Sequence, residues 1–176
     1  MNIVVLVGSP RKEGNTMLLA RAFAEGAEER NRVQVLSVAD LEVAPCRACN
    51  ECFGNGHRCV QQDDMHKVYA ALAEADMLVL ASPVYFYGVS AQLAAVIHRL
   101  HNPLRDDFHI RHAALLLAAA SHKPHICDGI KLQYTMLLDN FHIENCGMVV
   151  AQGVSAPGDV AKTEFLEEAR KLGRSI

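Results

Sequence analysis

The sequence predicts a three-layer, doubly wound α/β fold around a five-stranded parallel sheet. Apolar runs of strand length alternate along the chain with segments whose apolar residues have helical spacing. The runs are continuous rather than interrupted by polar residues, which is typical of strands buried on both faces. Right-handed crossovers between such strands place helices on both sides of the sheet. No linker, repeat or low-complexity tract divides the 176 residues, so we expect one domain over 1–176.

Hydrophobic spacing defines the elements of the first half of the chain. The first strand contains the uninterrupted apolar run from Ile3 to Val7, and the helix after it places Leu19 and Phe23 on one face. Asp63 opens a later helix, where an acidic side chain suits the positive N-terminal end. The expected elements of this half are the strands 2–8, 33–38 and 77–81 and the helices 15–30, 63–75 and 89–101.

The second half continues the alternation. The run from His112 to Ala120 is expected to be the fourth strand, although its alanine and leucine content also fits a helix. A helix, a short apolar strand that begins at Met148 and a final helix follow it. The expected elements of this half are the strands 112–120 and 148–152 and the helices 128–142 and 158–173.

Composition excludes several classes of protein. Hydrophobic residues make up 51% of the chain, which argues against disorder. The net charge of −3 argues against a broad nucleic-acid surface. No apolar run approaches the roughly 18–20 residues needed to span a bilayer, and no signal peptide is apparent. We therefore expect a cytoplasmic protein without nucleic-acid or membrane partners, whose six cysteines are not structural disulfides.

The loop after the first strand has the composition of an anion-binding turn. Residues 8–16 read Gly-Ser-Pro-Arg-Lys-Glu-Gly-Asn-Thr and lead into the first helix. A helix N-terminus has unpaired N–H groups and partial positive charge, so it attracts phosphate. Gly8 and Gly14 allow the backbone to approach an anion closely. Short polar side chains and one cation are expected to hold the phosphate: Ser9, Arg11, Asn15 and Thr16.

This loop matches neither of the two common nucleotide-binding motifs. A dinucleotide fingerprint requires G-x-G-x-x-G, but residue 10 is proline. A Walker loop requires Lys-Ser or Lys-Thr after the second glycine, but Asn15 follows Gly14. The alternative is a plain strand-to-helix turn with an Asn or Thr cap. We favour a site for a single phosphoryl group.

The loop after the third strand suits a flat ring system. It reads Ser-Pro-Val-Tyr-Phe-Tyr-Gly over 82–88, and three consecutive aromatic residues provide planar faces. The alternative is that these aromatic residues cap the hydrophobic core. In a doubly wound fold the loops after strands one and three face the same crevice. A phosphate site beside a site for a planar heterocycle predicts flavin mononucleotide (FMN), which has both parts.

The order and spacing of these motifs resemble the NADPH-dependent FMN reductase family, and most closely its iron–sulfur flavoproteins. The resemblance covers about residues 1–100 well and rests on Gly8-Ser9-Pro10-Arg11-Lys12, Gly14-Asn15-Thr16, Pro45-Cys46-x-x-Cys49-x-x-Cys52, Cys59, Asp63-Asp64-Met65, Ala75-Asp76 and Ser82-Pro83-Val84-Tyr85-Phe86. It implies a flavodoxin-like fold with strand order 2-1-3-4-5 that carries FMN. Members reduce flavins, quinones or other acceptors, often as homodimers or homotetramers with the flavin near a subunit interface.

The resemblance also implies roles for individual residues. Ser9, Arg11, Asn15 and Thr16 would hold the phosphate, and the isoalloxazine ring would be bordered by Pro83, Val84, Tyr85 and Phe86. Ser121 and His122 follow the fourth strand, where the family often closes over the flavin. The chain departs from the family in two places. Of the Lys-x-x-x-Asp-Arg run common after strand three, only Arg99 is present, and His122-Lys123-Pro124-His125 replaces the usual glycines.

Four clustered cysteines provide the second chemical signal. Such a set can ligate a [4Fe–4S] cluster, and its compact spacing resembles that of iron–sulfur flavoproteins. Structural zinc and metal-free thiols, including a redox disulfide, are the alternatives. The candidate ligands are Cys46, Cys49, Cys52 and Cys59, whereas Cys127 and Cys146 stand apart and are expected to be inert thiols.

Together these patterns predict a flavoprotein. The resemblance implies an FMN-dependent oxidoreductase that accepts electrons from NAD(P)H and passes them to a small-molecule or protein acceptor, with the cysteine loop as a candidate route through an iron–sulfur cluster. The flavin carries the chemistry, so no general base is assigned. Two other interpretations share the scaffold. A non-enzymatic electron carrier would bind FMN but need no nicotinamide site, and a thiol or metal sensor would respond through the cysteines.

Overall fold

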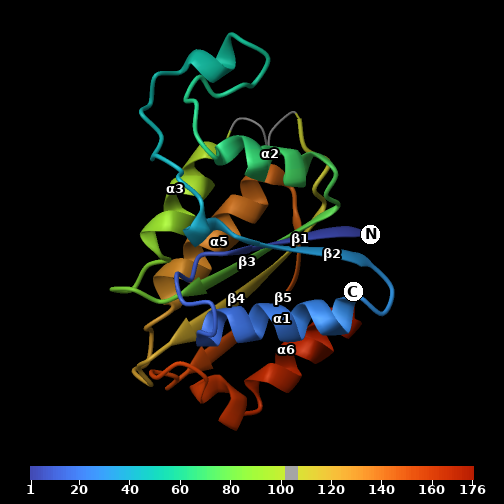
Figure 1. Cartoon of the computed structure of the whole chain (residues 1–176), viewed down its shortest axis with the longest axis vertical. Coiled ribbons are helices and arrows are strands. Elements are labelled where there is room, and N and C mark those ends of the chain that lie inside the picture. The colour runs from blue at the N-terminus through green and yellow to red at the C-terminus, as the bar shows by residue number, and fades with distance from the viewer. Residues whose placement is uncertain (102–106) are drawn as a thin grey trace.

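The computed structural model describes residues 1–101 and 107–176 and has a five-stranded sheet with the order β2-β1-β3-β4-β5 (Figure 1). All neighbouring strands are parallel, which confirms the predicted fold class and strand order. The order reverses between β1 and β3, so a crevice opens beyond the carboxyl ends of these two strands. The strands are β1 (Asn2–Val7), β2 (Arg32–Ser37), β3 (Met77–Pro83), β4 (His112–Ala119) and β5 (Glu144–Gln152).

Helices cover both faces of the sheet. In Figure 1, α1 and α6 lie below the sheet, and α2, α3 and α5 lie above it. The helices are α1 (Asn15–Ala27), α2 (Met65–Ala73), α3 (Ala91–Arg99), α5 (Asp128–Phe141) and α6 (Phe165–Arg174). Short 3₁₀ turns occur at η1 (Val38–Asp40), η2 (Glu51–Phe53) and η3 (Asp159–Lys162). Among the described residues, no helix combines the length and the apolar character needed to cross a membrane.

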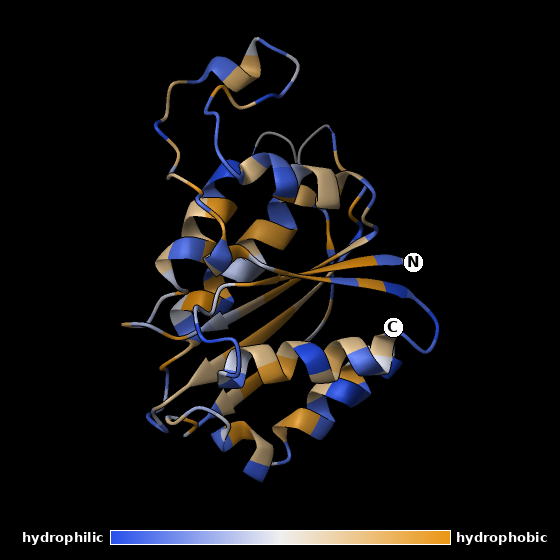
Figure 2. Ribbon diagram, in the orientation of Figure 1, coloured by the Kyte–Doolittle hydropathy of each residue, from blue (hydrophilic) through white to orange (hydrophobic). Residues whose placement is uncertain are grey.

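Successive residues of each strand contribute to two separate cores. In β1, Val4 and Leu6 pack with α2, α3 and α5, whereas Ile3 and Val5 pack with α1 and α6. Every residue of β3 is buried. The apolar ribbon of the strands therefore lies between helices that turn polar residues outward (Figure 2). This two-sided burial explains why the strand runs in the sequence are uninterrupted.

Helices α1 and α6 pack with their backbones in close approach. A Cβ on Gly26 would overlap the carbonyl oxygen of Arg170, and a Cβ on Gly173 would overlap the carbonyl oxygen of Phe23. Arg170 also forms an ion pair with Glu25, at 2.9 Å between Nη2 and Oε2. Because Gly26 and Gly173 have no side chain, α1 and α6 can pack at this short separation.

Three elements differ from the sequence-based expectation. Strand β5 begins at Glu144 rather than 148, and a register irregularity at Ala113/Ala114 accommodates an extra residue near Gly147, whose φ is 144°. The polar start of this strand gave no apolar pattern. The expected helix over 158–173 is split, because Thr163 is extended and separates η3 from α6. Strand β2 is largely exposed, since it lies at the edge of the sheet. The run from 112 is a strand, as predicted.

Candidate functional site

A cavity of about 240 Å³ lies at the carboxyl edge of the sheet, where the loops after β1, β3, β4 and β5 meet. It joins the two loops that the sequence singled out. The predicted residues that line it are Ser9, Arg11, Asn15, Thr16, Pro83, Val84 and Tyr85, and Gly14, Ala118, Ala120, Val154 and Ser155 complete the wall. Phe86, Ser121 and His122 lie outside this wall.

The N-terminus of α1 points into the cavity without a side-chain cap. Gly14 is the N-cap residue, and no side chain accepts a hydrogen bond from the first turn. The first turn contains no acidic residue. A capped strand-to-helix turn, the alternative interpretation of this loop, is therefore not what the structure contains. The uncapped N–H groups and the helix dipole favour an anion at this position.

Hydrogen bonds within the loop set its shape. The Ser9 hydroxyl oxygen accepts from the Arg11 N–H at 3.2 Å, and the Gly14 N–H donates to the Arg11 carbonyl at 3.0 Å. The Gly8 N–H donates to the carbonyl of Ala81 in β3 at 2.8 Å. These bonds hold the loop against the adjacent strand.

The side chain of Asn15 fastens a second loop over the first. Its amide nitrogen donates to the carbonyls of Val154 and Ala156, at 3.2 and 2.9 Å. Its amide oxygen accepts from the Val160 N–H at 3.1 Å. Both amide hydrogens are engaged, so this side chain has no donor left for a phosphate. We expected a direct ligand from this side chain, whereas the structure gives it the role of joining the loops after β1 and β5.

The aromatic loop forms a tight hairpin. Tyr85 and Gly88 exchange two backbone hydrogen bonds, at 2.9 and 3.0 Å, and Phe86 and Tyr87 between them have φ of 48° and 67°. These left-handed values are uncommon for residues with a side chain. Phe86 is 98% exposed. The hairpin therefore presents Phe86 to solvent, whereas Tyr85 reaches the cavity.

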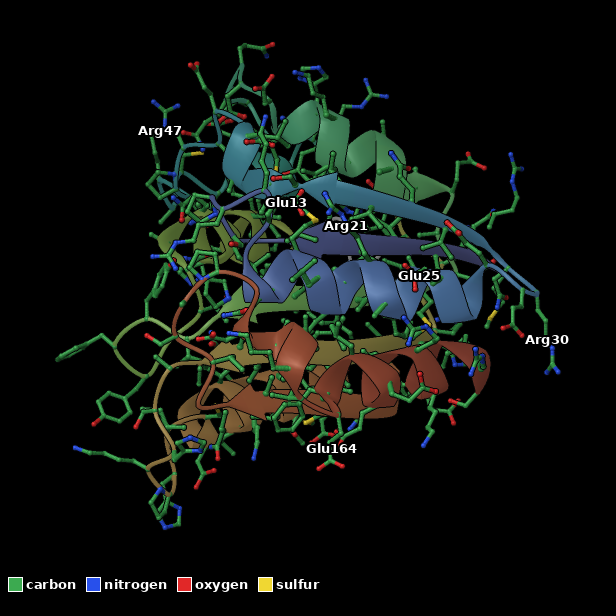
Figure 3. The ribbon with its side chains drawn as sticks, turned by 60° about the horizontal axis from the view of Figure 1, so that its bottom comes forward. Glu13, Arg21, Glu25, Arg30, Arg47 and Glu164 are labelled. Carbon is green, nitrogen blue, oxygen red and sulfur yellow. The ribbon has the colours of Figure 1, made fainter. Side chains whose placement is uncertain are left out.

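The four clustered cysteines lie on a segment that projects from the body of the protein. Figure 1 shows the segment around η2 extending beyond α2 and α3, and Figure 3 shows Arg47 of this segment on the opposite side of the view from Arg30. A second cavity of about 190 Å³ is lined by all four thiols: Cys46, Cys49, Cys52 and Cys59. Within residues 1–101 and 107–176, no three His, Cys, Asp or Glu side chains are close enough to hold a metal ion.

Comparison with known proteins decides the family. A sequence profile of the NADPH-dependent FMN reductases matches residues 1–156. The chain belongs to the NADPH-dependent FMN reductase family. It is therefore an oxidoreductase, and its family uses FMN and a reduced nicotinamide. An iron–sulfur flavoprotein of Methanocaldococcus jannaschii is 36% identical over 192 residues, which cover 100% of this chain and 95% of that protein.

Two solved structures share the fold of this reductase. An NAD(P)H:quinone oxidoreductase from Methanothermobacter marburgensis aligns with a TM-score of 0.79 at 17% identity, over 99% of this chain and 96% of the other. An FMN-dependent NADH-azoreductase from Bacillus anthracis, in complex with FMN, aligns with a TM-score of 0.71 at 14% identity, over 99% of both chains. At these identities the likeness shows a common flavodoxin-like fold.

Sequence reasoning missed the loop after β5 of the reductase. Val154 and Ser155 from this loop line the cavity. The Asp159 carboxylate accepts from the N–H groups of Ala156 and Ser155, at 2.7 and 3.2 Å. The Ala156 hydrogen bond, with help from Lys162, holds the pKa of Asp159 below its usual value. The signal in the sequence is the loop Gly-Val-Ser-Ala-Pro-Gly over 153–158, which follows a strand at the ligand edge of the sheet.

The loop after β4 lies beside the cavity. The Ser121 hydroxyl oxygen accepts from the Lys123 N–H at 3.1 Å, and the His122 side chain is exposed. The His122 ring lies against Gly153, where an added Cβ would collide with it. The ring therefore contacts the loop after β5 rather than the cavity, and a direct role of His122 toward the flavin stays a prediction.

Hydrogen bonding distinguishes Cys59 from the two isolated cysteines. Burial by itself raises the pKa of Cys59, but hydrogen bonds from the Gln61 backbone and from Arg99 hold the pKa below its ordinary value. Burial raises the pKa of Cys127 and of Cys146, which agrees with the expectation of inert thiols. The hydrogen bonds from Gln61 and Arg99 therefore favour the thiolate form of Cys59 relative to an ordinary cysteine.

Proposed function

We propose that the reductase binds FMN with its phosphate at the N-terminus of α1 and its isoalloxazine ring beside Pro83, Val84 and Tyr85. The observation that carries this proposal is the 240 Å³ cavity, which joins an uncapped helix N-terminus to an aromatic loop. Arg11 lines the same cavity and supplies a cation for the phosphate. Ser9 and Thr16 supply hydroxyl groups, and the backbone N–H groups of the first turn supply further donors.

Bound FMN supplies the redox chemistry, since it accepts a hydride from a reduced nicotinamide and releases electrons singly or in pairs. The residues of the chain bind and orient it. Tyr85 is held by the hairpin bonds with Gly88, so its backbone has a fixed position at the mouth of the cavity. Val84 is fixed to β4 by its N–H, which donates to the Ala118 carbonyl at 2.9 Å. These contacts preorganise the wall against which the ring would lie.

The cysteine loop is proposed to hold a [4Fe–4S] cluster that accepts electrons from the flavin. Four thiols are the usual donor set for such a cluster, and all four line one cavity. Relatives of the reductase that match its whole length are named iron–sulfur flavoproteins. Binding would draw the thiols together, because metal sites of this kind form as the ligands assemble. Zinc and metal-free thiols are the alternative outcomes of the test below.

A second copy of the chain is proposed to complete the flavin site. At about 240 Å³ the cavity is smaller than the roughly 300–1,000 Å³ of ordinary ligand pockets. An apolar stripe lies close to the aromatic hairpin, since Gly129 at the start of α5 is near the Tyr87 carbonyl and Leu132 and Met136 follow it as exposed residues. Exposed aromatic and aliphatic groups of this kind mark association surfaces.

The oligomer predicts a concentration-dependent mass. In sedimentation, we expect the native reductase to behave as a dimer or tetramer. The dissociation constant of the Phe86→Ser/Leu132→Ser variant should be about tenfold higher, since each lost apolar contact weakens association. The variant Val35→Ser, which changes an exposed apolar residue of the edge strand β2, is the control. A native monomer at 100 µM would contradict this part of the proposal.

A single preparation tests the flavin and the cluster. Reductase purified without oxygen is expected to bind FMN stoichiometrically, oxidise NAD(P)H with an added acceptor and contain about four irons and four sulfides per chain. Failure to bind FMN would contradict the proposed function. FMN binding without NAD(P)H oxidation would instead favour a non-enzymatic electron carrier. The variant Cys49→Ser should lose most of the iron, whereas Cys146→Ser should retain it. Zinc in place of iron would identify a structural site.

A further inference from the structure

One arginine connects α3 with both ends of the cysteine loop. The Arg99 side chain is 2% exposed. Its Nη1 donates to the Asp63 carboxylate at 2.5 Å and to the Ala44 carbonyl at 3.2 Å, and its Nη2 donates to Cys59 Sγ at 3.3 Å. Its Nε is buried and has no hydrogen-bond partner among the described residues. A buried cation, ion-paired with Asp63, therefore lies in contact with one of the four clustered thiols.

The two stems of the loop are already joined without the sulfur contact. The Ala44 N–H donates to the Asp63 carboxylate at 3.0 Å. Glu42 and Asp64 pair through two bonds, from the Glu42 N–H to the Asp64 carboxylate and from the Asp64 N–H to the Glu42 carbonyl, at 3.0 and 3.1 Å. These bonds close the loop even without the contact between Arg99 and Cys59. The structural effect of that contact is therefore to place a hydrogen-bond donor at the sulfur.

We propose that Arg99 is a positioning residue for Cys59 as a cluster ligand, and that its charge raises the reduction potential of the cluster. This inference rests on the proposed cluster. The planar guanidinium has donors in a rigid fork, so bonds to Asp63 and Ala44 fix the direction in which Nη2 meets the sulfur. A hydrogen bond to a ligand sulfur and a buried positive charge both favour the more electron-rich state of a cluster, which makes reduction easier.

Burial of Arg99 makes this effect specific to its position. A charge that is screened by water acts weakly on its neighbours, whereas one excluded from water acts strongly. Arg58 is adjacent to Cys59 in the sequence, but its side chain is exposed. The two arginines carry the same charge, but only Arg99 is buried and contacts the Cys59 sulfur, so they form a pair for an experiment.

The test compares reductase containing Arg99→Lys, Arg99→Gln or Arg58→Gln with the native protein, each with FMN and iron loaded. Two quantities are measured: the rate at which a chelator removes iron, and the midpoint potential of the cluster from an EPR-monitored titration. Outer contacts to metal ligands are typically worth about 10–100-fold in metal affinity. We therefore expect Arg99→Gln to lose iron at least about tenfold faster and to have a lower midpoint potential, with Arg99→Lys between it and the native protein.

The outcomes separate this inference from the proposed function. Arg58→Gln should match the native protein in both quantities, and FMN content should stay unchanged in all variants, because the flavin cavity contains neither arginine. If Arg99→Gln does not fold, Arg99→Lys keeps the charge and still loses the fork, so it must release iron faster. If the cluster has the native midpoint potential in both Arg99 variants, the proposed role of Arg99 is wrong, whereas the proposed cluster is unaffected. A native protein that takes up no iron would overturn the cluster and this inference with it.

Discussion

Gly14→Val is expected to weaken FMN binding by about 100-fold or more. A Cβ at Gly14 would lie 2.8 Å from the Arg11 Cβ and 3.3 Å from the Ser9 hydroxyl oxygen, so a branched side chain would displace both walls of the phosphate loop. Loss of two or more charge-assisted hydrogen bonds, each worth about 1.5–3 kcal/mol, accounts for this factor. FMN affinity is measured by quenching of flavin fluorescence on titration with the apoprotein.

Neighbouring residues of the same loop provide graded controls for this prediction. Gly14 has φ of −80° and ψ of 161°, values open to any residue, and the overlap is confined to the loop around Arg11, so the apoprotein should stay folded with a somewhat lower urea midpoint. Arg11→Gln should cost about tenfold in affinity, because Arg11 lines the cavity. Lys12→Gln should change the affinity little, since Lys12 does not line it. Near-native affinity in a folded Gly14→Val protein would show that the phosphate binds elsewhere.

Gly26→Val is expected to destabilise the fold by about 3 kcal/mol. Because the Gly26 backbone touches the Arg170 carbonyl oxygen, any Cβ forces α1 and α6 apart. Valine is a weaker helix former than alanine, so the gain in helix propensity over glycine is only about 0.5 kcal/mol and does not offset this overlap. In a domain of this size the change should lower the thermal midpoint by about 10 °C, as followed by circular dichroism.

Gly54→Ala is the matched control for Gly26→Val. Gly54 follows η2 on the projecting loop, and its nearest neighbour for a new Cβ is the Glu51 carbonyl oxygen at 3.9 Å, an ordinary contact. Its unfolding free energy should stay within about 0.5 kcal/mol of the native value. Equal midpoints for Gly26→Val and the native protein would contradict the close approach of α1 and α6.

The sequence was sufficient where a pattern depends on local chemistry or on burial of a whole strand. The uninterrupted apolar run that contains Val4 and the apolar run Met77–Ala81 predicted buried parallel strands, and the structure confirms both strands. The polar start of β5 at Glu144 and the extended Thr163 that splits the final helix left no such pattern. Hydrophobic periodicity reports burial, and these positions are neither regularly buried nor regularly exposed.

At the candidate site, the sequence predicted which loops meet but not how each side chain is used. The order of the strands placed the loops after β1 and β3 at one crevice, because parallel strands end on the same edge. It did not predict that the amide of Asn15 would be engaged by Val154 and Ala156, or that Phe86 would turn outward. These outcomes depend on partners more than 100 residues away and on the backbone of a two-residue turn.

The sequence by itself determined the sheet, its covering helices and the chemical types available to the site. Only the tertiary structure decided that Arg99 of α3 meets Cys59, 40 residues earlier, and that Gly26 meets Arg170. The reason is physical: propensity and periodicity are properties of neighbours along the chain, whereas hydrogen bonds and close contacts between distant segments arise once the cores on both faces of the sheet have fixed their positions.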